Sequence, residues 1–151
     1  MAPERSESDP SAPAEAGRAG LRAAADAVGE RWKLLVIASL LDGPRRFGDL
    51  ERELEGIAPN VLSARLRALE ADGLVVARPY SDRPPRYTYE LTELARGLAG
   101  AINLLAAWGA GDRATAAPVH RACGTPLSAG WYCSTCEQPV SDPDAEELDF
   151  A

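Results

Sequence analysis

The sequence is poor in cysteine and histidine, and it has no long apolar run. Its 151 residues include three cysteines and one histidine, and three cysteines cannot form a paired disulfide framework. No stretch approaches the roughly 18 consecutive apolar residues of a membrane span, and the first residues lack the apolar segment of a signal peptide. There is no phosphate-cradling glycine loop and no nucleophile elbow. These absences predict a soluble, cytoplasmic protein that is not an enzyme.

The negative charge of the chain is concentrated at its two ends. The formal net charge is −7 overall, with −2 in residues 1–20, −1 in residues 21–112 and −4 in residues 113–151. The middle of the chain is therefore close to neutral and contains local basic stretches that the average conceals. An acidic total does not exclude a nucleic-acid partner.

Composition divides the chain into four segments. Residues 1–18 have no large apolar side chain after Met1, so we expect a disordered tail. Residues 19–113 are long enough for one hydrophobic core. Residues 118–140 contain every cysteine and the only histidine, and residues 141–151 form an acidic tail that we expect to be disordered.

Apolar periodicity predicts four helices before a hairpin. An alanine-rich helix over 20–28 precedes a buried central helix over 32–41, which stops at the Gly-Pro pair of 43–44. Phe47, Leu50, Leu54 and Ile57 then recur at three- and four-residue spacings, which is typical of an amphipathic third helix. A fourth helix begins near Pro59 and ends before Gly73.

The fourth helix has one apolar face and one polar face without acids. At 100° per residue, the apolar face carries Leu62, Leu66 and Leu69. The opposite face carries Asn60, Ser63, Ala64 and Arg67, with Arg65 on the flank. A helix that enters a DNA groove must avoid carboxylates, because they would face phosphate charge.

A β-hairpin and a fifth helix complete the pattern. Residues 74–80 and 86–92 are rich in β-branched and aromatic residues, and the tip of the hairpin is basic, with Arg83 in the turn and Arg86 at the start of the second stretch. The fifth helix over 93–109 has the apolar stripe Leu94, Leu98, Ile102 and Leu105. This order predicts a mainly α (α+β) fold, a winged helix-turn-helix with a two-stranded wing. Its fourth helix would enter the major groove and its wing would reach the DNA backbone.

Four motifs in this region carry a family resemblance. "RW", "GPRRFGDL", "LSARLRALEADGLV" and "PPRYTYELT" occur in this order within residues 19–112, which closely resemble the HxlR family of bacterial transcriptional regulators. The resemblance implies a homodimer, joined through the first and fifth helices, that binds double-stranded DNA at a palindromic operator. It implies DNA contacts by Asn60, Ser63, Arg65 and Arg67 on the fourth helix and by Arg83 and Arg86 on the wing.

One feature departs from the family pattern. Many members have a cysteine about a dozen residues before "RW", and in some it is a redox sensor. That region is "AGRAGLRAAADAVGE" in this chain and contains no cysteine. The thiol-switch mechanism of those relatives is therefore not transferred.

Each candidate DNA contact also has an ordinary structural explanation. Arg67 could pair with Glu70 or Asp72 on its own helix, and Arg65 suits an intramolecular ion pair as well as a phosphate. Asn60 and Ser63 could serve only the start of the helix, and the wing could be an ordinary polar hairpin. Arg45 and Arg46, which precede the third helix, are weaker candidates for phosphate contacts.

The C-terminal segment has the ligand spacing of a structural zinc site. His120 and Cys123 are separated by two residues, and Cys133 and Cys136 repeat that spacing. Four such nitrogen and sulfur ligands fill a closed tetrahedral zinc site, as in a small zinc ribbon. Glu137 replaces the glycine that is usual after the second cysteine. A Cys133–Cys136 redox pair, three reduced structural thiols and a degenerate ribbon remain alternatives.

These features favour a sequence-specific DNA-binding transcriptional regulator, with repression as the expected effect. The alternative is a protein-interaction adaptor of the transcription machinery, because winged helices joined to zinc ribbons also serve as docking modules. An adaptor would more often expose apolar residues on its fourth helix and wing. The operator, the target genes and any effector are not encoded in a recognisable way.

Overall fold

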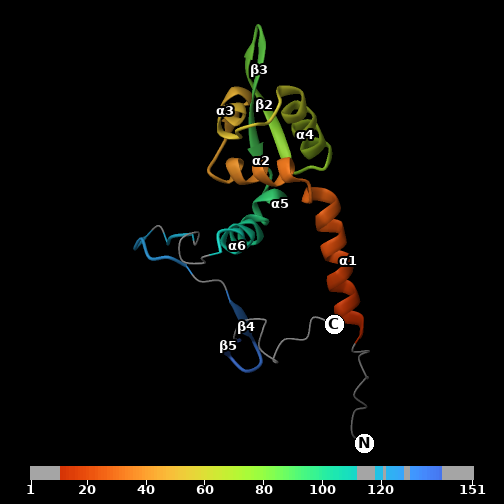
Figure 1. Ribbon diagram of the computed structural model, residues 1–151, viewed down its shortest axis with the longest axis vertical. Helices are drawn as coiled ribbons and strands as arrows, with labels where there is room; N and C mark the ends of the chain where they lie inside the picture. Colours follow the sequence, from red (N-terminus) through yellow and green to blue (C-terminus); the bar gives the residue numbers. More distant parts are fainter. Residues whose placement is uncertain (1–10, 112–117, 121, 128–129, 141–151) are drawn as a thin grey trace, which may run out of the picture. The chain divides into compact units, whose positions relative to one another are not determined.

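The computed structural model describes residues 11–111, 118–120, 122–127 and 130–140, and the predicted acidic tail over 141–151 lies outside them. The chain divides into two units, residues 27–127 and the remainder. No helix in the described part is both long and apolar enough to cross a membrane. The elements in chain order are α1 (Ser11–Val28), α2 (Arg31–Leu41), β1 (Arg45–Arg46), α3 (Phe47–Glu53), α4 (Pro59–Ala71), β2 (Val75–Asp82), β3 (Pro85–Leu91), α5 (Glu93–Arg96), α6 (Ala99–Gly109), β4 (Trp131–Cys133) and β5 (Gln138–Val140) (Figure 1).

Helix α1 begins earlier than its sequence predicts. It starts at Ser11, so the expectation of a disordered segment up to residue 18 is wrong from this residue onward. The stretch is rich in alanine, which has the highest helix propensity. Pro13 lies in the first turn, where its missing N–H has no intrahelical partner to lose. The first ten residues of the predicted tail lie outside the described residues.

The core of residues 27–127 fixes the orientation of α4. The leucines of the predicted apolar face, Leu62, Leu66 and Leu69, are fully buried. They pack in one cluster with Val36, Ile37 and Leu40 of α2 and with Leu50 of α3. Burying each such side chain contributes roughly 1.5–3 kcal/mol. The face that carries Asn60 and Arg67 is consequently held away from the core.

A short turn joins α3 to α4. Helix α3 ends at Glu53, although the apolar spacing predicted helix as far as Ile57. Leu54 and Ile57 are nevertheless buried, because the turn folds back onto the core. Gly56 has φ +85, a conformation that favours glycine. Two helices joined by this turn form the helix-turn-helix.

The wing is a long hairpin that belongs to a three-stranded sheet. Strands β2 and β3 continue to within two residues of each other, so they extend beyond the predicted strands. The sheet order is β1-β3-β2, and the unpredicted strand β1 pairs Arg45 with Tyr89 and Arg46 with Thr88. The hairpin runs between α3 and α4, and its tip projects beyond both helices (Figure 1). The fold is a winged helix-turn-helix, mainly α with a small antiparallel sheet, as the sequence predicts.

The predicted fifth helix is divided into two. Helix α5 ends at Arg96 and α6 begins at Ala99, with Gly97 between them. Glycine disfavours a continuous helix because it has the most backbone entropy to lose. The break separates the predicted stripe: Leu98 and Ile102 pack against the core, whereas Leu94 and Leu105 are exposed.

Candidate nucleic-acid interface

The exposed face of α4 is formed as the sequence predicts, and Arg67 has no acidic partner on it. Pro59 occupies the first helical position, Asn60 and Arg67 are exposed, and Ser63 is half-buried. No ion pair involves Arg67 among the residues that the structure describes. Asp72, one of its two alternative partners, pairs instead with Lys33 of α2 at 2.9 Å.

Lys33 of α2 links the C-terminal end of α4 to the C-terminal end of α1. It is the only lysine in the chain and is almost fully buried. Its ammonium donates to Asp72 Oδ2 at 2.9 Å and to the carbonyl oxygen of Ala27 at 2.8 Å. A buried charge is tolerated only when it is paired and hydrogen-bonded. These bonds therefore help to fix the angle at which α4 leaves the core.

Charges on α4 influence the pKa of Tyr89 on β3. Burial raises the pKa of its phenol, and Glu70 and Tyr87 raise the pKa further, while Arg67 lowers it. Helix α4 also packs against β2, the strand beside β3 in the sheet. The polar side of α4 and the wing form neighbouring parts of one surface.

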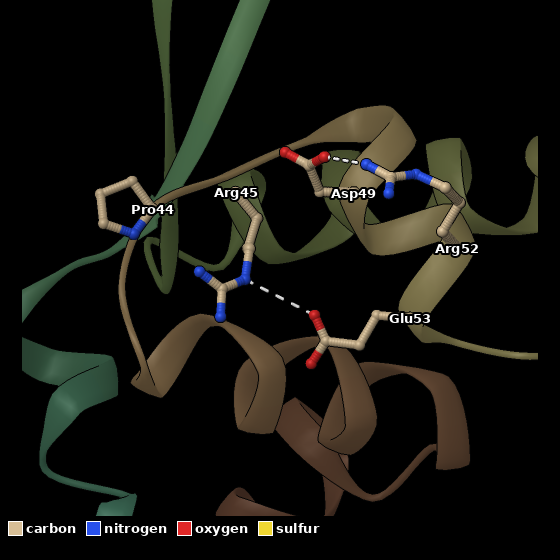
Figure 2. A pocket seen from close by; sticks show the side chains of 5 residues that line it. All are labelled: Pro44, Arg45, Asp49, Arg52 and Glu53. Atoms are coloured by element: carbon tan, nitrogen blue, oxygen red, sulfur yellow. Dashed lines mark hydrogen bonds and ion pairs between the residues drawn. The ribbon is translucent and has the colours of Figure 1, made fainter.

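Two of the predicted contact residues are held by carboxylates. Arg65 Nε lies 2.5 Å from Glu30 Oε2, and Glu30 is the residue that precedes α2. Arg45 Nε lies 3.5 Å from Glu53 Oε2, in a shallow pocket beside α3 where Arg52 and Asp49 also pair (Figure 2). Arg65 thus adopts its intramolecular alternative, and neither arginine is available to DNA without giving up its partner.

Arg46 and the wing share an aromatic groove. The guanidinium carbon of Arg46 lies 4.7 Å from the ring centre of Tyr80 on β2. A cation in this position is attracted by the negative face of the ring. The groove, of about 490 Å³, is also lined by Arg86 and Tyr87. Tyr80 and Tyr87 are exposed. They give no functional signal in the sequence, because strand propensity alone explains tyrosines in a hairpin.

The tip of the wing carries two exposed arginines. Arg83 is one of the two residues between the strands, and Arg86 follows the start of β3. Neither has an acidic partner in the described part of the chain, and the neighbouring Asp82 forms no ion pair there. Arg78, lower on the hairpin, differs because it pairs with Glu90.

The eight predicted DNA contacts therefore fall into distinct groups. Arg45 and Arg65 hold other parts of the fold together, and Asn60 and Ser63 lie at the start of α4. Of the eight, the arginines without an acidic partner among the described residues are Arg46, Arg67, Arg83 and Arg86. They come from the start of α3, from α4 and from the wing.

The His/Cys pairs of the C-terminal segment are each formed locally. His120 Nδ1 lies 3.3 Å from Cys123 Sγ. The hydroxyl and the backbone amide of Thr125 lower the pKa of the Cys123 thiol, and the backbone amides of Cys136 and Thr135 lower the pKa of the Cys133 thiol. No group of three or more His, Cys, Asp or Glu side chains is gathered as a metal site within the described ranges.

A helix-turn-helix followed by a projecting hairpin defines the winged-helix class of DNA-binding proteins. Residues 27–116 match the HxlR-like helix-turn-helix family. The chain belongs to this family, and it is a transcriptional regulator with a helix-turn-helix DNA-binding fold.

Similar proteins and structures agree with this assignment. An uncharacterized HTH-type transcriptional regulator of Mycobacterium tuberculosis is 40% identical over 123 residues, which cover 78% of this chain and 77% of that protein. The uncharacterized HTH-type transcriptional regulator YtcD of Bacillus subtilis is 37% identical over 90 residues, covering 60% of this chain and 71% of that protein. Among solved structures, the redox regulator HypR in its reduced form is 33% identical, with a TM-score of 0.59, and the match covers 62% of this chain and 93% of HypR.

Proposed function

We propose that this protein is a homodimeric, sequence-specific DNA-binding regulator that represses transcription by occupying a palindromic operator. The observation that carries the proposal is the distribution of free cations. Arg67 is exposed on the acid-free face of α4, and Arg83 and Arg86 are exposed on the wing beside it. An arginine in the major groove can bind guanine with two hydrogen bonds, whereas an arginine on phosphate contributes affinity without reading sequence.

Arg46 acts with the wing as a phosphate contact. Its stacking on Tyr80 restricts the guanidinium before DNA arrives, so less side-chain entropy is lost on binding. The backbone N–H of Arg46 also donates to Asp49 Oδ2 at 3.1 Å, which holds the start of α3. Arg45 and Arg65, which are already paired with Glu53 and Glu30, contribute less.

Helix α6 is the proposed centre of the dimer interface, together with α1, as the family resemblance implies. It contains no charged residue. Leu104, Leu105 and Trp108 are exposed on it, and Trp108 exposes 80% of its surface. Several exposed large apolar side chains on one helix are typical of an interaction site. A two-fold dimer would present two copies of α4 to two related half-sites.

Repression, a cytoplasmic location and the absence of catalysis complete the proposal. A dimer bound across a promoter excludes polymerase by occupying the DNA. The redox property named for HypR is not extended to this chain, because its three cysteines all lie between residues 123 and 136.

The adaptor alternative has less support. An adaptor would expose large apolar residues on the helix that docks with its partner. In the described residues, none of the exposed large hydrophobic side chains lies on α4, and the two on the wing, Tyr80 and Tyr87, line the same groove as Arg46 and Arg86. The surface around α4 and the wing instead carries unpaired arginines.

Selection of bound duplexes from a random DNA pool, with the full-length protein at moderate salt, tests the proposal. We expect enrichment of a palindrome whose half-sites are about one helical turn apart, or a multiple of it. The Arg67→Ala variant should enrich a motif with one position relaxed in each half-site. The matched control is Arg96→Ala, which removes an exposed arginine from α5 and should leave the motif unchanged.

The selection can contradict the proposal in two ways. If wild-type protein with native helical content enriches no motif, sequence-specific binding is refuted. If the enriched motif is a single, asymmetric half-site, the homodimeric part is refuted.

A further inference from the structure

The aromatic groove between the start of α3 and the wing has the size and lining of a small-molecule site. Its volume is about 490 Å³, and it is lined by four aromatic rings and by charged side chains. The rings are those of Phe47, Tyr80, Tyr87 and Tyr89. Ligand sites commonly measure roughly 300–1,000 Å³ and combine apolar or aromatic walls with a few polar groups. This groove therefore offers both parts of such a site.

The four rings are not explained by contact with duplex DNA. Phe47 and Tyr89 pack against the hydrophobic core, so the fold fixes their positions. Tyr80 and Tyr87 are 45% and 44% exposed, so each presents part of its ring to solvent. A duplex presents phosphates and sugars to such a surface, because its bases are stacked inside. The rings consequently fit a flat aromatic ligand, which pairs with them in offset-stacked or edge-to-face geometry.

The charge of the groove favours an anion. Arg46, Arg52 and Arg86 line it, and Asp49 is the one acid among its described lining residues. Asp49 is already engaged, because it pairs with Arg52 and accepts the backbone N–H of Arg46 at 3.1 Å. Arg46 and Arg86 form no ion pair within the described chain. Their two positive charges therefore remain available to a ligand.

Arg46 can contact a ring and an anionic group at the same time. Its guanidinium carbon lies 4.7 Å from the centre of the Tyr80 ring. A guanidinium stacks on aromatic faces with its flat side, while its N–H donors lie in its own plane and can bind a carboxylate with two hydrogen bonds. A ligand with an acid group on an aromatic ring can thus contact the arginines and the tyrosines of this groove together.

We propose that the aromatic groove binds a small aromatic anion, with one ring or two fused rings, as an effector of this regulator. The ring packs against Tyr80 and Tyr87, and the anionic group pairs with Arg46 and Arg86. Such a ligand supplies the negative charge that the two arginines lack and the aromatic partner that duplex DNA does not offer.

The effector and DNA exclude each other, because both use the same arginines. This part of the inference rests on the proposed function, in which Arg46 and Arg86 contact phosphate. An arginine that binds the ligand anion is not free to bind a phosphate. The bound effector therefore lowers DNA affinity and releases the operator.

Isothermal titration calorimetry of the full-length protein without DNA tests the site. The probe is 2-naphthoate, and two matched compounds each lack one of its features. The first, 2-naphthalenemethanol, should bind about tenfold or more weakly, because it has the rings but cannot form charge-assisted hydrogen bonds. The second, decahydro-2-naphthoate, should bind about threefold or more weakly, because it has the charge but no aromatic ring to stack.

Three variants and a control locate the binding in the groove. Arg86→Met and Tyr87→Leu should each weaken 2-naphthoate binding about threefold or more, whereas Tyr87→Phe keeps the ring and should keep the affinity. Both residues are exposed, so these changes leave the core intact. The matched control is Arg96→Ala, which removes an exposed arginine of α5 outside the groove and should bind 2-naphthoate like the wild type.

Displacement of DNA is measured separately, by fluorescence anisotropy of a labelled duplex. Addition of 2-naphthoate should lower the DNA affinity of the wild type more than an equal concentration of decahydro-2-naphthoate, which adds the same salt. Unchanged DNA affinity of the ligand-bound protein would overturn the proposed exclusion.

The outcomes separate this inference from the proposed function. The site is refuted if 2-naphthoate does not bind, binds no more tightly than its analogues, or binds Arg86→Met and Tyr87→Leu as well as the wild type. If 2-naphthoate binds in the groove but the protein binds no duplex, the site is supported and the proposed function fails instead.

Discussion

Removal of the charge at the wing tip, in Arg83→Ala, is expected to lower the salt dependence of DNA binding. Arg83 lies between β2 and β3 at the projecting end of the hairpin (Figure 1). No ion pair involves it in the described portion of the chain, and it does not contribute to the hydrophobic core. Its removal should therefore affect phosphate contact without affecting folding.

The magnitude follows from counterion release. Each phosphate contact contributes about 0.9 to the slope of log affinity against log salt concentration. A homodimer carries two copies of Arg83, so the variant should lose about 1.8 units of slope. Over a fourfold increase in salt, from about 50 to about 200 mM, the affinity of the wild type should fall about tenfold more than that of the variant.

Fluorescence anisotropy with a labelled random-sequence duplex measures this slope. Arg96→Ala is the matched control, because it also removes an exposed arginine and should retain the wild-type slope. Arg45→Ala should change the slope less than Arg83→Ala, since Arg45 is already paired with Glu53. If folded Arg83→Ala keeps the wild-type slope, the wing tip does not contact phosphate and the reasoning is wrong.

Three further predictions concern base reading, stability and assembly. Arg67→Ala should reduce discrimination at one base position by about 1–3 kcal/mol, measured by competition between operator variants, and unchanged discrimination would remove Arg67 from the groove. Asp72→Ala leaves the buried ammonium of Lys33 without its carboxylate. It should lower the free energy of unfolding in urea by about 1–3 kcal/mol, less than for a fully buried pair because Asp72 is partly exposed; no loss would mean that the ion pair does not stabilise the fold. Leu105→Glu places a charge on the exposed apolar face of α6. It should shift a dimer to monomer in light scattering, and a persistent dimer would exclude that face as the interface.

The orientation of α4 was predictable because it depends on the spacing of residues within the helix itself. Leu62, Leu66 and Leu69 repeat at helical spacing, so the opposite face, including Arg67, follows from geometry alone. The hairpin was predictable for a similar reason, since two strand-like stretches flank a basic turn. Both predictions depend only on residues close together in the sequence.

Which arginines are paired and which are free was not predictable, because their partners are distant in the sequence. Arg65 pairs with Glu30, the residue before α2, and the guanidinium of Arg46 lies over the ring of Tyr80 on β2. Strand β1 has only two residues and no pattern of its own, so its pairing exists only once β3 is in position. Sequence can identify candidate cations, whereas the fold decides which of them remain free.

The predicted boundaries of the first and fifth helices were wrong, because helix propensity and apolar spacing do not fix where a helix begins or breaks. Alanine-rich sequence begins α1 at Ser11, nine residues before its predicted start. The opposite error occurs at Gly97, where a continuous apolar stripe concealed the break between α5 and α6. The stripe is compatible with core packing and with a dimer helix, and its members divide between the core and the surface.

Arginine footprinting of the wild-type protein tests the central claim most directly. The protein is treated with an arginine-reactive dicarbonyl at low salt, with and without saturating duplex DNA, and modification is measured by mass spectrometry. The account predicts protection by DNA of Arg46, Arg67, Arg83 and Arg86, and unchanged modification of Arg31 and Arg96, which are exposed elsewhere. Equal modification of Arg67, Arg83 and Arg86 with and without bound DNA would contradict the claim that α4 and the wing form the DNA-binding surface.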